Sequence, residues 1–372
     1  MKHEALDELF EIDDVLNHTP KSDALFLEAM KEAFHFHYAH NEVYKNICDD
    51  ENFNIDAVKS IDDLSSIPHF LVDIFKWYSL LSIPEKDIEF TFTSSGTSGQ
   101  KSHISWDKGS HERQTIMRQK IMQSYDLVSE EAVNYMIFAY APEVSDSKGA
   151  AYAHQMYASF APTNKKFFAI HADENKKPIF DAVESFKKLE EFSKDSVALR
   201  IIGFPAFIYQ TLSYMKENSI KLKFNENSLI IIAGGWKNMA NDAISPKEFA
   251  TLCDELLGID SSKIRDIYGF VEHGVPYITC ESGHFHVPIY SRIFTREPGS
   301  LRVLDEGEKG LLHVLSPYNY AQPALSILAT DYVKVHSKCS CGRDGQYIEL
   351  LGRAGLKKHQ GCAITATELL KR

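Results

Sequence analysis

The sequence has no long hydrophobic run and few cysteines. None of its apolar stretches reaches the ~18 residues that a membrane-spanning helix needs, so the chain is not expected to cross a membrane. The opening stretch, MKHEALDELFEIDD, is acidic and polar, which is unlike a secretory signal. Six cysteines in 372 residues are too few for a disulfide framework. These absences predict a soluble, cytoplasmic protein.

The chain also lacks an excess of positive charge. Lys and Arg number 40 against 52 Asp and Glu, which gives a formal net charge of −12 at pH 7. An acidic surface repels phosphate backbones, so general nucleic-acid binding is excluded, although a local basic pocket for one nucleotide is compatible with this charge. With 44% hydrophobic residues, the chain can bury a sizeable core in one large domain or two ordinary ones.

Hydrophobic periodicity separates the first two regions of the chain. Residues 1 to about 80 are predicted to be mainly helical, because apolar residues recur there at roughly helical spacing. From about residue 87, β-rich runs alternate with amphipathic segments, which is typical of a mostly parallel α/β sheet covered by helices. The expected strands are Val133–Tyr140, Lys166–Ile170, Val197–Ile202, Leu229–Ala233 and Ile264–Tyr268, and the expected helices are Ala151–Phe160, Phe180–Phe192 and Ala206–Lys216.

The end of the chain is predicted to form a smaller β-rich unit. Short strands joined by turns are expected at Phe285–Ile293, Leu311–Leu315, Leu325–Ala329, Tyr332–Val335 and Gln346–Leu351. The resulting organisation is a helical N-terminal region over 1–85, an α/β core over 86–283, a β-rich subdomain over 284–352 and a tail over 353–372.

The sharpest local feature is a loop rich in glycine and hydroxyl side chains, Phe92-Thr-Ser-Ser-Gly-Thr-Ser-Gly-Gln-Lys101, which follows strand-forming residues. Such a loop brings backbone N–H groups and hydroxyls close around phosphate oxygens, and Lys101 adds a point charge. Its spacing fits neither G-x-x-x-x-G-K-[ST] nor G-x-G-x-x-G. The alternative is an ordinary polar turn.

The segment TSSGTSGQK resembles the signature loop of the adenylate-forming superfamily, which includes acyl-CoA synthetases, luciferase-type ligases and aryl-acid ligases. Further segments follow in the order of that superfamily: Gly234-Gly235-Trp236-Lys237, Tyr268-Gly269-Phe270-Val271-Glu272, Ala329-Thr330-Asp331, and the arginines of Cys341-Gly342-Arg343 and Gly352-Arg353. The short length, Val72–Leu80 with its FK pair, IRDIYGFVE and KKHQGCAITATE resemble the LuxE-type acyl-protein synthetases. The resemblance runs from about residue 30 to the C-terminus, and the CxCGR element is similar to that of phenylacetate–CoA ligases.

This resemblance implies an adenylate-forming α/β fold and an enzyme that uses ATP to convert a carboxylic acid into acyl-AMP. Glu272 would hold Mg²⁺, a hard cation that prefers carboxylate and phosphate oxygens. The residues implied to bind the nucleotide are Thr93, Ser94, Ser95, Gly96, Thr97, Ser98, Gly99 and Lys101 at the phosphates, Gly234, Gly235, Tyr268 and Gly269 near the adenine, and Asp331 with Arg343 or Arg353 at the ribose or phosphate.

The tail carries the predicted acyl acceptor. Typical members of the superfamily have a C-terminal lid with a lysine that acts in adenylation, and this lid is expected to be largely absent, because the sequence ends 19 residues after Arg353. The LuxE-type resemblance implies that Cys362 carries the acyl group. Nearby Lys357, Lys358 and protonated His359 would favour its thiolate, the reactive form. The alternative is a small buried structural cysteine.

A second group of residues has the composition of a metal site. A CxC pair with a distant Cys/His group suits a structural zinc tetrahedron, which would join two β-hairpins and do no chemistry. The preferred ligands are Cys280, His286, Cys339 and Cys341, with His284 as the alternate. The alternative is a set of free, reduced thiols.

Three functions follow from these observations. The leading one is formation of acyl-AMP and then of a thioester on Cys362, with an acyl reductase or another protein as the next acceptor. The second keeps adenylation but transfers the acyl group directly to coenzyme A or a carrier-protein thiol, and the third is a nucleotide-binding scaffold without activity. The walls of the acid pocket are expected from Ala206–Tyr209 and Gly234–Trp236, whose aromatic residues fit a fatty chain or an aryl ring equally well.

Overall fold

The computed structural model describes residues 3–93, 102–144, 156–234, 236 and 243–353. The chain forms two compact units. Among the described residues, the first unit takes in 3–93, 102–125 and 269–353, which are distant in the sequence, and the second takes in 126–144, 156–234, 236 and 243–268. The domain boundaries at residues 86, 284 and 353 stay a prediction.

The first unit begins with three helices, as the periodicity predicts: α1 (Glu4–Glu11), α2 (Pro20–His40) and α3 (Glu42–Asp50). Helix α2 starts at a capping box, in which Thr19 and Ser22 each accept a hydrogen bond from the other's backbone N–H. Pro20 at the first helical position supports the same start. Short 3₁₀ turns follow at Ile55–Ala57, Asp62–Ser66, Val72–Lys76 and Glu85–Asp87.

A hairpin precedes the last helix of the first unit. Strands β2 (Ile88–Thr93) and β3 (His103–Asp107) form an antiparallel two-stranded sheet, and α4 (Lys108–Gln123) follows β3 directly. The side chain of Asp107 caps α4 by accepting a hydrogen bond from the backbone N–H of Ser110.

The sheet of the first unit is built mainly from the end of the chain. Its order is β12 (Arg292–Arg296), β13 (Gly310–Leu315), β14 (Ser326–Lys338), β15 (Asp344–Arg353), β11 (Phe285–His286) and β10 (Tyr277–Thr279), with β1 (Phe70–Leu71) parallel to β14. The segments 325–329 and 332–335, expected as two strands, form the single strand β14, because β14 pairs with β13 and β15 along its length. The segment 285–293 splits into β11 and β12 around Pro288, which cannot donate to a strand ladder.

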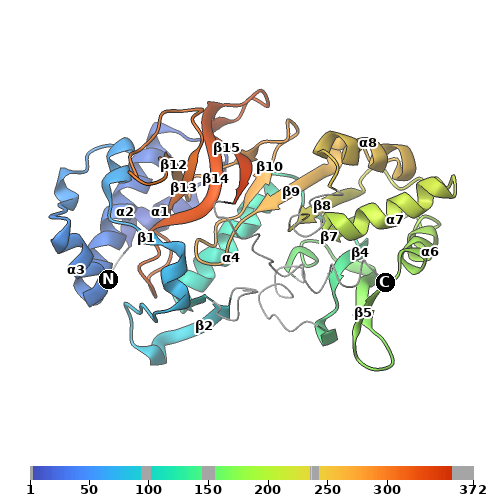
Figure 1. Cartoon of the computed structure of the whole chain (residues 1–372), viewed down its shortest axis with the longest axis horizontal. Helices are drawn as coiled ribbons and strands as arrows, with labels where there is room; N and C mark the ends of the chain where they lie inside the picture. Colours follow the sequence, from blue (N-terminus) through green and yellow to red (C-terminus); the bar gives the residue numbers. More distant parts are fainter. Residues whose placement is uncertain (1–2, 94–101, 145–155, 235, 237–242, 354–372) are drawn as a thin grey trace. The chain divides into compact units, whose positions relative to one another are not determined.

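The N-terminal helices lie beside the strands from the end of the chain within this unit (Figure 1). The guanidinium of Arg292 on β12 lies 4.5 Å from the ring centre of Phe26 and binds Asp23, both on α2. The rings of Phe10 and Tyr290 are 4.5 Å apart. These contacts join the N-terminal helices to β12 and the turn before it, more than 250 positions later in the sequence.

The second unit is the α/β part. Its sheet has the order β9 (Ile264–Tyr268), β8 (Leu229–Ala233), β7 (Leu199–Gly203), β4 (Val133–Tyr140), β5 (Thr163–Ala172) and β6 (Pro178–Phe180), parallel except for β6. Its helices are α6 (Ala182–Phe192), α7 (Pro205–Glu217) and α8 (Pro246–Leu257), with 3₁₀ turns at Pro142–Val144 and Ser261–Lys263. The predicted parallel α/β arrangement is confirmed, and the first half of the predicted helix Ala151–Phe160, residues 151–155, lies outside the described residues.

Residue type explains the position of β4 in this sheet. All of its residues except Tyr140 are buried, and β4 lies between two parallel neighbours, as a strand covered on both faces should. Among the described residues, no helix combines the length and the hydrophobicity required to span a bilayer.

Candidate active site

The strands that flank the predicted phosphate loop are firmly paired. Thr93 at the end of β2 pairs with His103 at the start of β3, and the Thr91 and Ser105 hydroxyls are 3.1 Å apart. The Phe92 and Trp106 rings are 4.4 Å apart, a cross-strand aromatic contact that stabilises the hairpin. The predicted phosphate-binding residues Ser94, Ser95, Gly96, Thr97, Ser98, Gly99 and Lys101 lie outside the described residues, as do Gly235 and Cys362.

Glu272, the predicted Mg²⁺ ligand, is buried in the first unit with 6% of its surface exposed. Burial raises the pKa of its carboxyl group, and interactions with Ser102 and Lys76 oppose this shift. A carboxylate placed in this way is costly to ionise without a cation beside it. The nearby positive charge of Lys76 therefore helps Glu272 to ionise.

A network of buried hydrogen bonds supports the turn that follows Glu272. Nε2 of His273 lies 2.9 Å from the Tyr277 hydroxyl, which lies 2.8 Å from the hydroxyl of Ser291. Gly274 has a φ of +74°, and a Cβ there would lie 2.1 Å from Oη of Tyr318. The turn therefore requires glycine both for its conformation and for space.

Asp331 and Arg353 lie side by side in the first unit. They are paired positions of β14 and β15, and Nε of Arg353 donates a hydrogen bond to Oδ1 of Asp331 at 3.3 Å. Asp331 is buried in the strand, whereas the side chain of Arg353 is 56% exposed. A carboxylate oxygen that accepts one hydrogen bond can accept others, so this pair suits a ligand with hydroxyl groups.

Arg343 lies at the other end of the same hairpin. Its guanidinium binds the carboxylate of Glu281 through two hydrogen bonds, of 2.8 and 3.3 Å, and lies 5.1 Å from the ring centre of Tyr125. The sequence left Arg343 and Arg353 as alternatives for the nucleotide. The structure places only Arg353 against Asp331.

The predicted metal ligands Cys280, His286, Cys339 and Cys341 come together in the first unit. Their four ligand atoms all lie within 4.8 Å of one another. His284 lies beside this set, with Nδ1 3.2 Å from Sγ of Cys339 and its ring stacked on Tyr347.

The parallel strands of the second unit end at one edge of its sheet. Gly203 ends β7, Ala233 ends β8 just before Gly234, and Tyr268 ends β9. The register pairs Gly203 with Ile232 and Ala233 with Ile267, so these strand ends are neighbours. Ligands of open α/β sheets bind at the carboxyl ends of strands, which is where Gly234 and Tyr268 lie. Gly269 follows Tyr268 in the chain and belongs to the first unit.

Aromatic side chains gather at this carboxyl edge. The ring of Phe204 lies 6.4 Å from that of Tyr140 and 6.1 Å from that of Phe207. Gly234 has a φ of +93°, and a Cβ there would lie 3.0 Å from the Phe204 ring, so a side chain at this position would be strained and crowded.

The two segments predicted to line the acid pocket meet in the second unit. The rings of Tyr209 and Trp236 are 5.5 Å apart, and Trp236 also lies 6.4 Å from Phe249 on α8. Within Ala206–Tyr209, the first three residues are buried, and Tyr209 alone is partly exposed. Tyr209 and Trp236 are therefore the better candidates for contact with a ligand.

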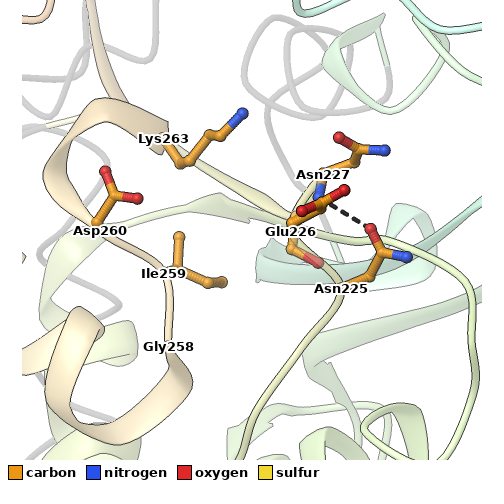
Figure 2. A pocket seen from close by; sticks show the side chains of 8 residues that line it. Asn225, Glu226, Asn227, Gly258, Ile259, Asp260 and Lys263 are labelled. Carbon is orange, nitrogen blue, oxygen red and sulfur yellow. Dashed lines mark hydrogen bonds between the residues drawn. The ribbon is translucent and has the colours of Figure 1, made fainter.

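The second unit also has a polar pocket at the opposite edge of its sheet, shown in Figure 2. Its volume is about 290 Å³, and one side is fixed by a hydrogen bond of 2.8 Å from the backbone N–H of Asn227 to Oδ1 of Asn225. It is lined by Asn225, Glu226, Asn227, Ser228, Gly258, Ile259, Asp260 and Lys263. These residues precede β8 and β9, so the pocket lies at the amino ends of the strands and contains no predicted site residue.

Sequence reasoning gave no role to Lys76 and Asp73, whose charges act on Glu272. Both belong to the 3₁₀ turn Val72–Lys76, and Nζ of Lys76 lies 2.5 Å from Oδ1 of Asp73. The available signal was the FK pair in Val72–Leu80, which contributed to the family resemblance without indicating a contact with Glu272.

Comparisons with known proteins show which family the chain resembles over nearly its whole length. The family described as "Acyl-protein synthetase, LuxE" matches residues 3–371. A long-chain-fatty-acid–luciferin-component ligase of Aliivibrio fischeri is 28% identical over 97% of this chain and 95% of its own length. A ligase of the same name from Vibrio harveyi is 25% identical over 91% of this chain and 86% of its own.

Solved structures confirm the fold. A crystal structure of 2-hydroxyisobutyryl-CoA ligase in an open conformation, in complex with 2-HIB-AMP and CoA, has a TM-score of 0.64 with this chain. The match covers 92% of this chain and 71% of that one, at 13% sequence identity. The predicted adenylate-forming fold is therefore correct.

Proposed function

The chain belongs to the acyl-protein synthetase family LuxE and is an AMP-forming acid–thiol ligase; on this premise we propose that it activates a long-chain fatty acid with ATP and carries the acyl group on Cys362. The observation that carries the proposal is the family match over residues 3–371, which contains every predicted motif. The names of the Aliivibrio fischeri and Vibrio harveyi relatives support a fatty acid over an aryl acid.

The first step forms the mixed anhydride. An oxygen of the fatty acid carboxylate attacks the α-phosphorus of ATP. The bond between the α-phosphorus and the oxygen that bridges it to the β-phosphorus breaks, and pyrophosphate leaves. Positioning and neutralisation of charge supply most of the acceleration in such chemistry. In our proposal, Thr93 to Lys101 surround the β- and γ-phosphates, and Glu272 holds Mg²⁺, which neutralises phosphate charge when bound.

The nucleoside end of ATP is assigned to residues at strand ends and paired strands. We assign the ribose hydroxyls to Asp331, because its carboxylate is buried and oriented by Arg353. Gly234, Tyr268 and Gly269 are assigned to the adenine side. Trp236 and Tyr209 are assigned to the acyl chain, since an aromatic surface buries alkyl groups favourably.

The second step transfers the acyl group to the chain itself. The Cys362 thiolate attacks the acyl carbon, the bond to the AMP phosphate oxygen breaks, and AMP leaves as a thioester forms. The thiol proton is released to solvent. An acyl reductase or another acceptor protein then takes the acyl group from Cys362.

The compartment is part of the same proposal. The cysteines among the described residues are free of disulfides, although the sulfurs of Cys280 and Cys339 are only 3.7 Å apart. Free neighbouring thiols fit a reducing compartment, so we place the reaction in the cytoplasm. A structural Zn²⁺ at these thiols would take no part in the reaction.

The proposal is tested by two measurements on the full-length protein. Fatty acids of several chain lengths should support ATP–pyrophosphate exchange, and a radioactive fatty acid should label the protein through a hydroxylamine-sensitive bond. The Cys362→Ser variant should lose the label and keep exchange, whereas the Cys253→Ser control should keep both.

Two other results would contradict parts of the proposal. Full acyl transfer to coenzyme A or a carrier protein by Cys362→Ser would favour direct transfer. ATP binding without exchange for any acid would favour a nucleotide-binding scaffold.

A further inference from the structure

The thiols and imidazole at the closed end of the β14–β15 hairpin have the spacing of a tetrahedral metal site. Sγ of Cys280 and Sγ of Cys339 are 3.7 Å apart, and Sγ of Cys341 lies 3.3 Å from Nε2 of His286. A disulfide would place sulfurs at about 2.05 Å, so these two are not bonded. With Zn–S distances of about 2.3 Å and Zn–N distances of about 2.05 Å, tetrahedral ligands lie roughly 3.8 Å (S to S) and 3.6 Å (S to N) apart.

Two tight turns present these ligands. Cys280 begins a turn in which its carbonyl accepts a hydrogen bond from the N–H of Gly283, and Cys339 does the same with Gly342. Both glycines have positive φ, +79° and +85°, and a Cβ at either position would meet nothing within 4 Å. Glycine is therefore needed there for backbone conformation alone. The same type of turn therefore occurs once on each hairpin, and the two turns place Sγ of Cys280 and Sγ of Cys339 beside each other.

The surroundings complete the site. Three thiolates and a neutral imidazole around Zn²⁺ carry one net negative charge. The Arg343 guanidinium hydrogen-bonds Cys341 and is held in place by Glu281, so it offsets that charge.

We propose that Cys280, His286, Cys339 and Cys341 bind a structural Zn²⁺ and that Arg343 is its charge-compensating neighbour. Four protein ligands leave no open position for a substrate, which distinguishes a structural from a catalytic zinc site. This zinc site is independent of the activity proposed above, because none of its residues is assigned to bind the acid or ATP or to act with Cys362.

The metal would join two parts of the first unit. Cys280 and His286 belong to the β10–β11 hairpin, and the other two ligands lie in the turn between β14 and β15. Strand β11 already pairs with β15 at His286 and Tyr347, but over only two residues. A metal bond across this short pairing would hold the β14–β15 register, in which Asp331 faces Arg353.

The direct test is the metal content of the purified full-length protein after dialysis against a weak chelator. One zinc and no iron per chain is expected by inductively coupled plasma mass spectrometry. Cys339→Ser and His286→Gln should lose most of it. Cys253→Ser, a buried cysteine of the second unit, and His284→Gln, a histidine beside the cluster, should keep it.

Absence of zinc in the parent protein, iron in its place, or retention of zinc in both Cys339→Ser and His286→Gln would overturn the proposal. If the variants do not fold, replacing the metal of the unmutated protein with Co²⁺ still tests the proposal. Co²⁺ in the unmutated protein should give the intense visible bands and sulfur-to-metal charge transfer of a tetrahedral thiolate site. A weak octahedral spectrum would overturn the assignment.

Discussion

The two ends of the β14–β15 hairpin each hold an arginine against a carboxylate, but their burial is reversed. At the open end, Asp331 is 12% exposed and Arg353 is 56% exposed. At the closed end, Arg343 is 19% exposed and its partner Glu281 is 47% exposed. The less exposed member is therefore the anion at one end and the cation at the other.

The reversed burial distinguishes Arg343 from Arg353, which the sequence left as alternatives for the nucleotide. A buried carboxylate beside an exposed cation can accept hydrogen bonds from ligand hydroxyls, which suits the proposed role of Asp331 at the nucleoside end of ATP. A half-buried guanidinium beside thiols compensates negative charge, which suits a thiolate metal site. We infer that one hairpin serves a ligand site at its open end and a structural site at its closed end.

The largest expected effect comes from breaking the closed end. Cys341→Ser removes one of four proposed metal ligands, and loss of a structural metal belongs to the most destabilising class of substitutions. We expect a loss of about 4 kcal/mol in unfolding free energy and a melting temperature lower by about 10 °C, measured by calorimetry. If Cys341→Ser melted at the same temperature as the control Cys253→Ser, no metal would stabilise this end.

The second effect comes from breaking the open end. Asp331→Ala removes charge-assisted hydrogen bonds to the ribose, and we expect kcat/KM for ATP to fall about 100-fold in pyrophosphate exchange, equivalent to about 3 kcal/mol. Zinc content should stay the same. The exposed Asp305→Ala in the same unit is the matched control. Equal losses in both variants would remove Asp331 from the site.

The two arginines give a reciprocal test of smaller size. Arg343→Ala should weaken zinc affinity about 10- to 100-fold, as expected for a residue that supports metal ligands, and should leave the KM for ATP unchanged. Arg353→Ala should leave zinc affinity unchanged and raise the KM for ATP. The rise should be only about 3-fold, because an exposed arginine contributes little. Chelator competition and exchange kinetics measure these effects. If the KM for ATP rose in Arg343→Ala and not in Arg353→Ala, Arg343 would be the arginine that acts at ATP.

The smallest effect concerns the pH dependence of stability at Glu272, whose carboxyl group is buried. Burial raises its pKa above the usual 4.5, so its protonated form favours folding and its contribution is lost as pH rises from 4.5 through the raised pKa. Without ATP or Mg²⁺, Glu272→Gln should therefore gain stability over the parent protein as pH increases. Melting curves from pH 4 to 8 test this, and a constant difference would contradict it.

The local patterns of the chain predicted much of the fold. Strands β4, β8 and β9 have the bounds predicted for them, Val133–Tyr140, Leu229–Ala233 and Ile264–Tyr268, because each run is rich in the β-branched or aromatic residues that favour strands. The N-terminal helices follow from the spacing of apolar residues. Sequence alone did not predict that Asp331 lies inside one long strand, since that depends on pairing with β15, a long-range contact.

The sequence by itself determined the ordered motifs, the family and the candidate metal ligands, because each depends on residue type and spacing. Only the tertiary structure decided that Arg353 meets Asp331 while Arg343 meets Glu281, and that Lys76 acts on Glu272. It also decided that four ligand atoms separated by up to 61 positions lie within 4.8 Å (Cys280 to Cys341, 341 − 280 = 61). The physical reason is that strand register and hairpin closure bring distant residues together, and neither is encoded in any local segment.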